Sequence, residues 1–274
     1  MAVFDVSDLS NHRLVALPRL HAARVRAVRV RHPLLVSADD AGALCVSLLS
    51  DTGVRAAART VIPGLLDLAF EPLEPSLPSG APGADALLIS TTDRRVRRVT
   101  LPGADALAAW PHGAPLPLGA DEAALPSAAA LLCAGGPGGA GGAWLLAACA
   151  DRALRAFSVT LAPGAFALAP AGEDTSAPAQ CSAIAADAAG AVLVGGADGS
   201  VALRTRAALG AGGARHRRHR GFTGGGVSAA AVGEGALAGW LVSGSADGSL
   251  VVQAKDPLAP PAAAPPGAVP VLEG

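Results

Sequence analysis

The chain repeats one pattern of hydrophobic and polar positions five times. In each copy an apolar strand runs into small residues, turns, and leaves as a second apolar strand, most clearly over residues 192–203 and 241–252. Asp-Gly at such a turn predicts a hairpin, because glycine accepts the positive φ that the turn requires. The turns recur at intervals of 47 to 58 residues, at Gly42, Arg94, Arg152, Gly199 and Gly248. A hairpin that recurs at this spacing is typical of the blades of a β-propeller.

The repeats predict an all-β fold with about five four-stranded antiparallel blades, each with the hairpin joining its middle strands. The blades are expected at about residues 14–50, 60–101, 127–161, 180–209 and 221–256. Stretches rich in Pro and Gly at 71–85 and 135–142 predict surface loops, and residues 102–126 predict a linker. Residues 2–6 predict an orphan outer strand, so we expect an incomplete ring over residues 1–256. The Pro/Ala-rich residues 257–274 predict a disordered tail.

The amino-acid composition limits the partners and the cellular compartment that we expect for this protein. The 274 residues carry a net charge of −1, which favours neither nucleic acid nor an anionic membrane as a partner. Three Trp and five Phe predict a core made from Ala, Val and Leu. Residues with GC-rich codons (Ala, Gly, Pro and Arg) are in excess, which we attribute to base composition. Glycine-rich or arginine-rich stretches are therefore weak evidence for a functional site. Four cysteines without a CxxC pair predict free thiols in a reducing compartment, hence the cytoplasm or the nucleus.

Three features of the repeats resemble the WD-repeat family. His21 opens a repeat, small residues and Asp precede each turn, and residues 3–5 close a strand on an aromatic-Asp pair. The family's Trp is replaced in later repeats by Val99, Phe157, Arg204 and Gln253. Residues 35–44 are similar to a Ser-Ala-Asp-Asp-x-Gly-Ala motif in the subgroup of WD repeat-containing protein 53. This resemblance implies that the sequence is truncated at its N-terminus and lacks the first blade and most of the second.

No motif in the sequence predicts catalysis. Residues 135–142 are rich in glycine but lack the Gly-Lys-Ser/Thr of a phosphate-binding loop. His216 and His219 lie among four arginines without acidic or Cys ligands nearby, which disfavours zinc. No Ser-His-Asp order or pair of carboxylates stands out. We therefore expect no enzyme activity, no catalytic residue, no cofactor, no metal and no small-molecule substrate.

Arginines provide the candidate partner-binding residues. The resemblance to WD-type blades implies that two kinds of segment lie on one rim. These are the turn between the middle strands and the loop that enters each blade. The arginines expected there are Arg24, Arg94, Arg152, Arg217 and Arg218. Positive charge on one rim would steer an acidic partner towards it. The competing interpretation is that codon bias scatters arginine wherever lysine would otherwise stand.

The resemblance implies a non-catalytic scaffold or adaptor for protein–protein interaction, with other proteins as partners and no membrane or nucleic acid. One alternative is a substrate receptor of a cullin-RING ubiquitin ligase, although no closing strand matches the Trp-Asp-x-Arg docking motif of those receptors. A second alternative is a propeller subunit of an RNA-processing or RNA-modifying complex. The basic residues 215–220 are the feature that favours it.

Overall fold

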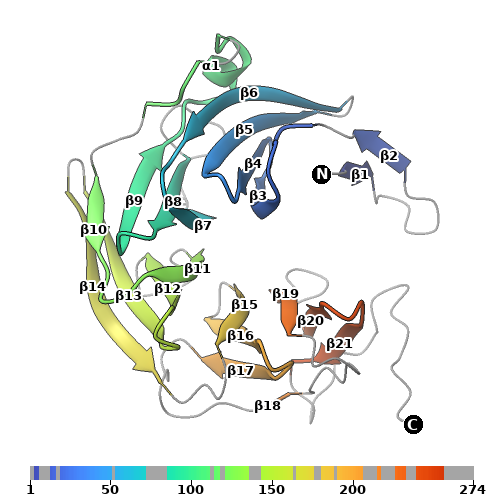
Figure 1. Ribbon diagram of the computed structural model, residues 1–274, viewed down its shortest axis with the longest axis vertical. Coiled ribbons are helices and arrows are strands. Elements are labelled where there is room, and N and C mark those ends of the chain that lie inside the picture. Colours follow the sequence, from blue (N-terminus) through green and yellow to red (C-terminus); the bar gives the residue numbers. More distant parts are fainter. Residues whose placement is uncertain are drawn as a thin grey trace. The chain divides into compact units, whose positions relative to one another are not determined.

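A computed structural model describes the strands and most of the turns between them (Figure 1). The described residues are 3–5, 13–16, 19–50, 53–71, 85–111, 114–117, 121–135, 143–162, 165–175, 180–187, 190–205, 215–216, 226–232 and 239–255. They fall into two compact units. Unit 1 holds Met1–Gly136 with Thr160–Leu168, and unit 2 holds Pro137–Val159 with Ala169–Gly274.

Five antiparallel sheets account for most of the described residues, and each follows the chain order of its strands. The first consists of β3 (Val25–Arg31), β4 (Leu34–Asp39), β5 (Ala43–Ser50) and β6 (Gly53–Val61). The second consists of β7 (Leu65–Phe70), β8 (Ala86–Thr91), β9 (Arg95–Thr100) and β10 (Glu122–Ala124). The third consists of β11 (Ala129–Gly135), β12 (Trp144–Cys149), β13 (Leu154–Ala162) and β14 (Ala165–Asp174).

The last two sheets belong to unit 2. The fourth consists of β15 (Cys181–Ala186), β16 (Ala191–Gly196), β17 (Val201–Thr205) and β18 (Arg215–His216). The fifth has three strands within the described residues: β19 (Val227–Val232), β20 (Trp240–Ser245) and β21 (Leu250–Ala254). The predicted tail at 257–274 and most of the predicted loops at 71–85 and 135–142 lie outside the described residues.

All five predicted turn positions are confirmed, because each has a left-handed backbone between two paired strands. The φ values are 81° at Gly42, 63° at Arg94, 70° at Arg152, 81° at Gly199 and 85° at Gly248. In every turn this residue donates its N–H to the carbonyl three residues earlier, as Gly42 does to Asp39 at 2.9 Å. Two of the five turns therefore place arginine where a residue with a Cβ is strained.

Arg94→Gly is expected to stabilise the protein by about 0.5–1 kcal/mol, because glycine adopts the left-handed backbone without strain and this gain exceeds the added freedom of the unfolded chain. Urea unfolding measures the change, with Arg94→Ala as the control. Alanine keeps the strained Cβ, so its stability should stay within about 0.5 kcal/mol of the wild type. Equal stabilisation by both variants would show that the arginine side chain, and not the backbone, is the source.

The N-terminal strand and the linker need correction. The strand expected to be an orphan is β1 (Val3–Asp5), but it pairs with β2 (Arg13–Ala16) in a two-stranded antiparallel sheet. The segment 102–126 is more than a linker, since it contains the helix α1 (Ala104–Ala108) and the strand β10. The strand β10 was missed because outer strands carry no turn signature that marks them in the sequence.

Small aliphatic side chains build the core, as the composition predicts. In unit 1 one apolar cluster joins the facing sides of the first and second sheets, with Leu34, Val36, Leu68 and Ile89 wholly buried. Leu107 of α1 belongs to the same cluster. In unit 2 a second cluster packs Leu193 against Val227 and Leu241. Cys45, Cys149 and Cys181 are buried free thiols, and burial raises the pKa of Cys181 to about 12.

Candidate functional site

A continuous set of main-chain hydrogen bonds links the turns at one end of the strands in unit 1. Asp40 donates to the carbonyl of Arg24, Ile62 to Gly42, Thr92 to Gly64, and Leu125 to Arg94, at distances of 2.8 to 3.0 Å. The bonds connect the turns β4–β5 and β8–β9 with the loops that enter β3, β7 and β11. We call this set of segments (Arg24, Asp39–Gly42, Ile62–Gly64, Thr91–Arg94 and Leu125) the turn rim.

The turn rim has little freedom to change shape. A Cβ at position 42 would lie 2.4 Å from the carbonyl oxygen of Ile62. The β4–β5 turn therefore packs against the loop before β7 so closely that only glycine fits at position 42. Since both main-chain and steric contacts hold these segments, the rim presents its side chains from a fixed backbone. Within unit 1, Arg24 and Arg94 therefore stand on the same rim, as their positions in the repeats imply.

His21 links Ser37 and Asp39 beneath the rim in an arrangement that superficially resembles a catalytic triad. Nδ1 of His21 lies 3.0 Å from Oδ2 of Asp39, and Nε2 lies 2.7 Å from Oγ of Ser37. A carboxylate only accepts, so Nδ1 carries the proton and Ser37 donates to Nε2. However, Ser37 is completely buried and Asp39 is 1% exposed, so no substrate reaches the hydroxyl. The trio instead fastens the loop before β3 to strand β4.

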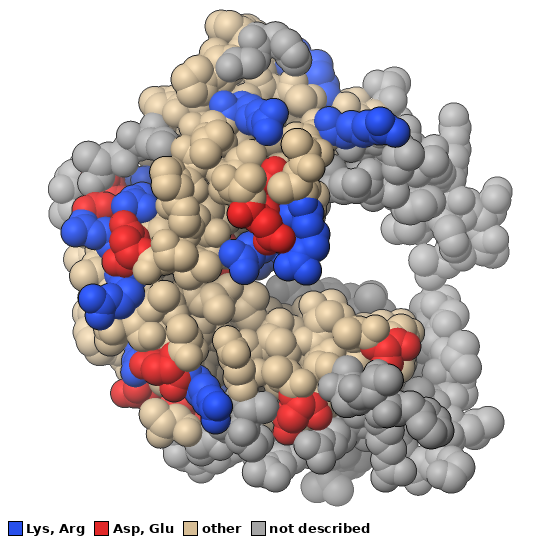
Figure 2. Space-filling model, viewed as in Figure 1, with Lys and Arg blue, Asp and Glu red and all other residues tan. Residues whose placement is uncertain are grey.

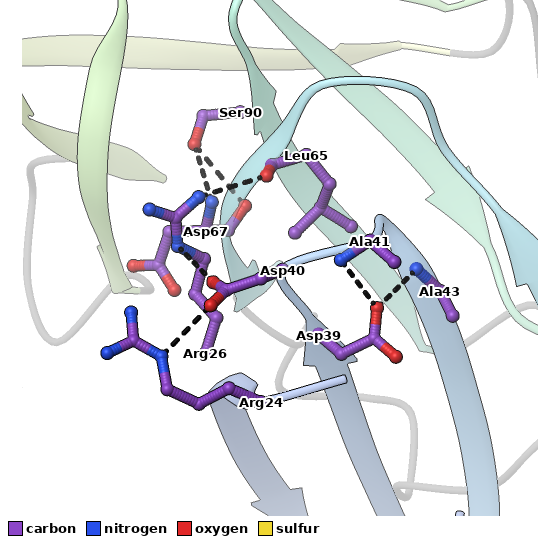
Figure 3. A network of polar contacts seen from close by, with 9 residues as sticks. All are labelled: Arg24, Arg26, Asp39, Asp40, Ala41, Ala43, Leu65, Asp67 and Ser90. Atoms are coloured by element: carbon purple, nitrogen blue, oxygen red, sulfur yellow. Dashed lines mark hydrogen bonds and ion pairs between the residues drawn. The ribbon is translucent and has the colours of Figure 1, made fainter. Parts of the chain in front are cut away.

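Asp39 also fixes the β4–β5 turn from the inside. Its Oδ1 accepts hydrogen bonds from the amides of Ala41, at 3.0 Å, and Ala43, at 2.9 Å (Figure 3). Burial alone would raise the pKa of Asp39, but the bonds from Ala43, His21 and Ala41 together lower it below its ordinary value. The carboxylate is therefore held in its charged form by hydrogen bonds, and its role is structural.

Asp67 joins three innermost strands within unit 1. Its carboxylate lies 3.0 and 3.1 Å from the guanidinium of Arg29 on β3 and accepts the amide of Leu132 on β11 at 2.8 Å. Ser90 of β8 bonds to the main chain of Asp67 from the other side (Figure 3). Asp67 is 2% exposed, and burial raises its pKa in spite of Arg29. This contact positions the blades that carry the rim.

Arg24 and Arg26 share one carboxylate at the rim (Figure 3). Nε of Arg24 lies 2.9 Å from Oδ2 of Asp40, and Nε of Arg26 lies 3.6 Å from Oδ1 of the same side chain. Arg26 also donates to the carbonyl of Leu65 at 3.3 Å. The side chain of Arg24 is 80% exposed. Two guanidinium groups on a single carboxylate leave one positive charge unbalanced here.

The β8–β9 turn contains both paired and unpaired arginines. Arg97 contacts Asp93 at 2.6 Å and Glu122 at 3.5 Å, and Arg95 pairs with Glu122. Arg94 is exposed, and none of the described residues forms an ion pair with it. Arg94, the predicted contact residue of this turn, is thus the arginine whose charge no described carboxylate balances.

The remaining predicted residues cannot be joined to this rim. Arg152 occupies the equivalent position in the β12–β13 turn of unit 2 and is exposed. Arg217 and Arg218 lie outside the described residues. In Figure 2 the basic side chains mostly lie beside acidic ones over the coloured surface, rather than in a separate basic field. Whether all five arginines share one face remains a prediction.

A pocket of about 670 Å³ lies at the opposite end of the strands of unit 1, between α1 and the ends of β5 and β6. Its lining is mainly aliphatic, with Ser50, Arg55 and Asp105 as the polar members. Arg55 already donates to the carbonyls of Leu107 and Ala108 at the end of α1. The main cationic group of the pocket is therefore engaged in holding the helix.

Comparison with known proteins identifies solved structures of similar fold but no related sequence. No protein-family model matches the sequence, and no curated protein sequence does. The β-propeller domain of Cps50 (Swd1) from Myceliophteria thermophila matches with a TM-score of 0.55 and 13% identity, covering 85% of this chain and 71% of that chain. Sqt1 from Saccharomyces cerevisiae matches with a TM-score of 0.55 and 11% identity, covering 92% of this chain and 76% of that chain.

Sqt1 from Chaetomium thermophilum, solved with the N-terminus of ribosomal protein L10, has a TM-score of 0.58 and 18% identity. That match covers 92% of this chain, which spans 64% of the length of its neighbour. The chain therefore has a β-propeller fold, with the five blade sheets given above among its described residues. Among the described residues, no helix has the length and hydrophobicity needed to cross a bilayer.

Proposed function

We propose that this protein is a non-catalytic scaffold or adaptor that binds other proteins through the rim of its propeller. The observation that carries the proposal is the turn rim itself, a fixed backbone that presents exposed and incompletely paired arginines. Rigid surfaces bind with a smaller loss of conformational entropy than flexible ones. The structure of Sqt1 with the N-terminus of ribosomal protein L10 supports it by analogy, since a protein of similar fold binds a segment of another protein.

Affinity purification of the full chain followed by mass spectrometry tests this proposal. We expect one or more proteins to be recovered in fixed ratio, and we expect Arg217→Glu with Arg218→Glu to reduce their recovery several-fold, more strongly at low salt. The double variant should keep the thermal midpoint of the wild type if neither side chain is needed for packing. Recovery of no specific partner would contradict the proposed function, and unchanged recovery by the variant would remove these two arginines from the site.

The same purification separates the alternatives. A cullin-RING adaptor among the recovered proteins would support a ubiquitin-ligase receptor, and RNA or an RNA-modifying enzyme would support the role suggested by residues 215–220. We propose the cytoplasm or the nucleus as the location, which the buried free thiols support. We also propose the subgroup of WD repeat-containing protein 53, on the basis of residues 35–44, whose Asp39 holds the β4–β5 turn.

A further inference from the structure

We propose that Lys255 is a site of acylation by an acyl thioester, and that acylation releases the end of β21 from the β15–β16 turn of the neighbouring sheet. Lys255 is the only lysine of the chain, which has 21 Lys and Arg residues together. This inference concerns unit 2 and does not depend on the proposed function.

Lys255 joins the fifth sheet to the fourth through a carboxylate that is nearly buried. Its Nζ pairs with Oδ2 of Asp187 in the β15–β16 turn, and the side chain of Asp187 is only 10% exposed. Oδ1 of Asp187 accepts the amide of Ala191 at 2.8 Å, which closes that turn. Lys255 lies directly after β21, where its own amide donates to the carbonyl of Gly239 at 2.8 Å. One side chain thus ties the end of the fifth sheet to a turn of the fourth.

This contact differs from the other ion pairs between neighbouring sheets because its cation is an amine. Within the described residues, the other ion pairs that join two sheets all use a guanidinium. They are Arg29–Asp67, Arg31–Asp85 and Arg204–Asp174. A guanidinium stays protonated in proteins, whereas a lysine amine becomes a nucleophile once it has lost its proton. An acyl donor therefore reacts at this contact and leaves the other three unchanged.

The reaction requires only the Lys255 side chain, water and the acyl donor. The side chain is 27% exposed, so its amine can leave Asp187 and meet a thioester in solution. The ammonium first loses one proton to water. The free amine then forms a C–N bond with the acyl carbon while the C–S bond breaks, and the sulfur leaves as a thiol with the second proton. The product is a neutral amide, which no longer forms an ion pair with Asp187.

Acylation takes away the cation that pairs with Asp187 among the described residues. A carboxylate with little access to water is costly without a paired cation, so the turn and the end of β21 should separate and become hydrated. Other contacts between the two sheets do not depend on this charge. Ser182 of β15 donates to the carbonyl of Val227 on β19 at 2.6 Å, and Leu193 packs against Leu241. Acylation should therefore loosen one end of the interface while the sheets stay packed.

Hydrogen–deuterium exchange of the full chain before and after treatment with acetyl-coenzyme A tests the inference, with mass spectrometry to locate the acetyl groups. We expect acetylation of Lys255 and exchange about tenfold faster at the amides of Gly190, Ala191 and Lys255, because loss of a partly exposed ion pair opens the contact locally. Lys255→Gln should show the same faster exchange without the reagent. Lys255→Arg is the matched control, since it keeps a positive charge without an amine, and treatment should not change its exchange.

Each outcome decides the inference. Faster exchange at these amides in the acetylated wild type, with no effect of treatment on Lys255→Arg, supports it. The dose is one that acetylates the N-terminal amine completely, so an unmodified Lys255 would overturn it. An equal effect of treatment on Lys255→Arg, or unchanged exchange in the acetylated wild type or in Lys255→Gln, would overturn it as well. None of these results alters the recovery of partners by affinity purification, so the proposed function stands or falls separately.

Discussion

Asp67→Ala is expected to lower the free energy of unfolding by about 2–4 kcal/mol, because its buried carboxylate is lost to partners on both β3 and β11. The substitution leaves the Arg29 guanidinium, 34% exposed, without its carboxylate. It also leaves the buried amide of Leu132 without an acceptor, which costs about 1–3 kcal/mol by itself. Because Asp67 joins β3, β7 and β11, the loss should affect the whole of unit 1.

Urea unfolding of the two variants Asp67→Ala and Asp40→Ala measures this effect against a matched control. Asp40 also pairs with arginines, but its side chain is 38% exposed, so its loss should cost at most about 1 kcal/mol. A similar cost for both variants would mean that the buried contact has no special role in joining the strands. A large loss for Asp67→Ala alone is the result that the structure predicts.

Asp39→Ala is expected to destabilise the protein by about 3 kcal/mol at pH 7. The side chain accepts bonds from His21 and from the amides of Ala41 and Ala43, and the amide of Ala43 is buried. Each buried donor left without a partner costs about 1–3 kcal/mol. Asp151→Ala is the control, because Asp151 lies in the corresponding β12–β13 turn but is exposed, and should lose at most about 1 kcal/mol.

The cost of Asp39→Ala should depend on pH in a defined direction. The pKa of Asp39 is lower in the folded protein than its ordinary value of about 3.9, so its stabilising contribution is complete above that value. The contribution is lost as the pH falls further, through the lower pKa of the folded state. The difference in unfolding free energy between wild type and variant should therefore shrink below about pH 4. A difference that stays constant down to pH 2 would contradict the assigned hydrogen bonds.

The sequence predicts the hairpins well and the long-range contacts poorly. Turn chemistry is local, so Gly42, Gly199 and Gly248 mark their turns directly, and Arg94 and Arg152 follow from the spacing. The outer strands β6, β10 and β14 fall outside the predicted blades because only their partners in space define them.

At the candidate site, too, the sequence predicts features set by neighbouring residues and misses contacts between residues far apart in the chain. Arg24 and Arg94 were recognised from their places in the repeat. The pairing of Arg29 with Asp67, 38 residues away, requires the packed sheets and could not be read from a pattern. The Ser37–His21–Asp39 trio was likewise missed, because its members are separated by 16 and 18 residues and follow no catalytic order. Sequence thus identifies which residues are charged, and structure identifies which charges are left for a partner.

Hydrogen–deuterium exchange of the free protein and of the complex recovered by affinity purification tests the central claim most directly. The account predicts that the partner slows exchange at the β4–β5 and β8–β9 turns, around Asp39–Gly42 and Thr91–Arg94. Exchange at the β3–β4 turn, at the opposite end of the same strands, should not change. Protection confined to the β3–β4 turn and the α1 pocket, with none at the turn rim, would contradict the claim that the rim is the binding surface.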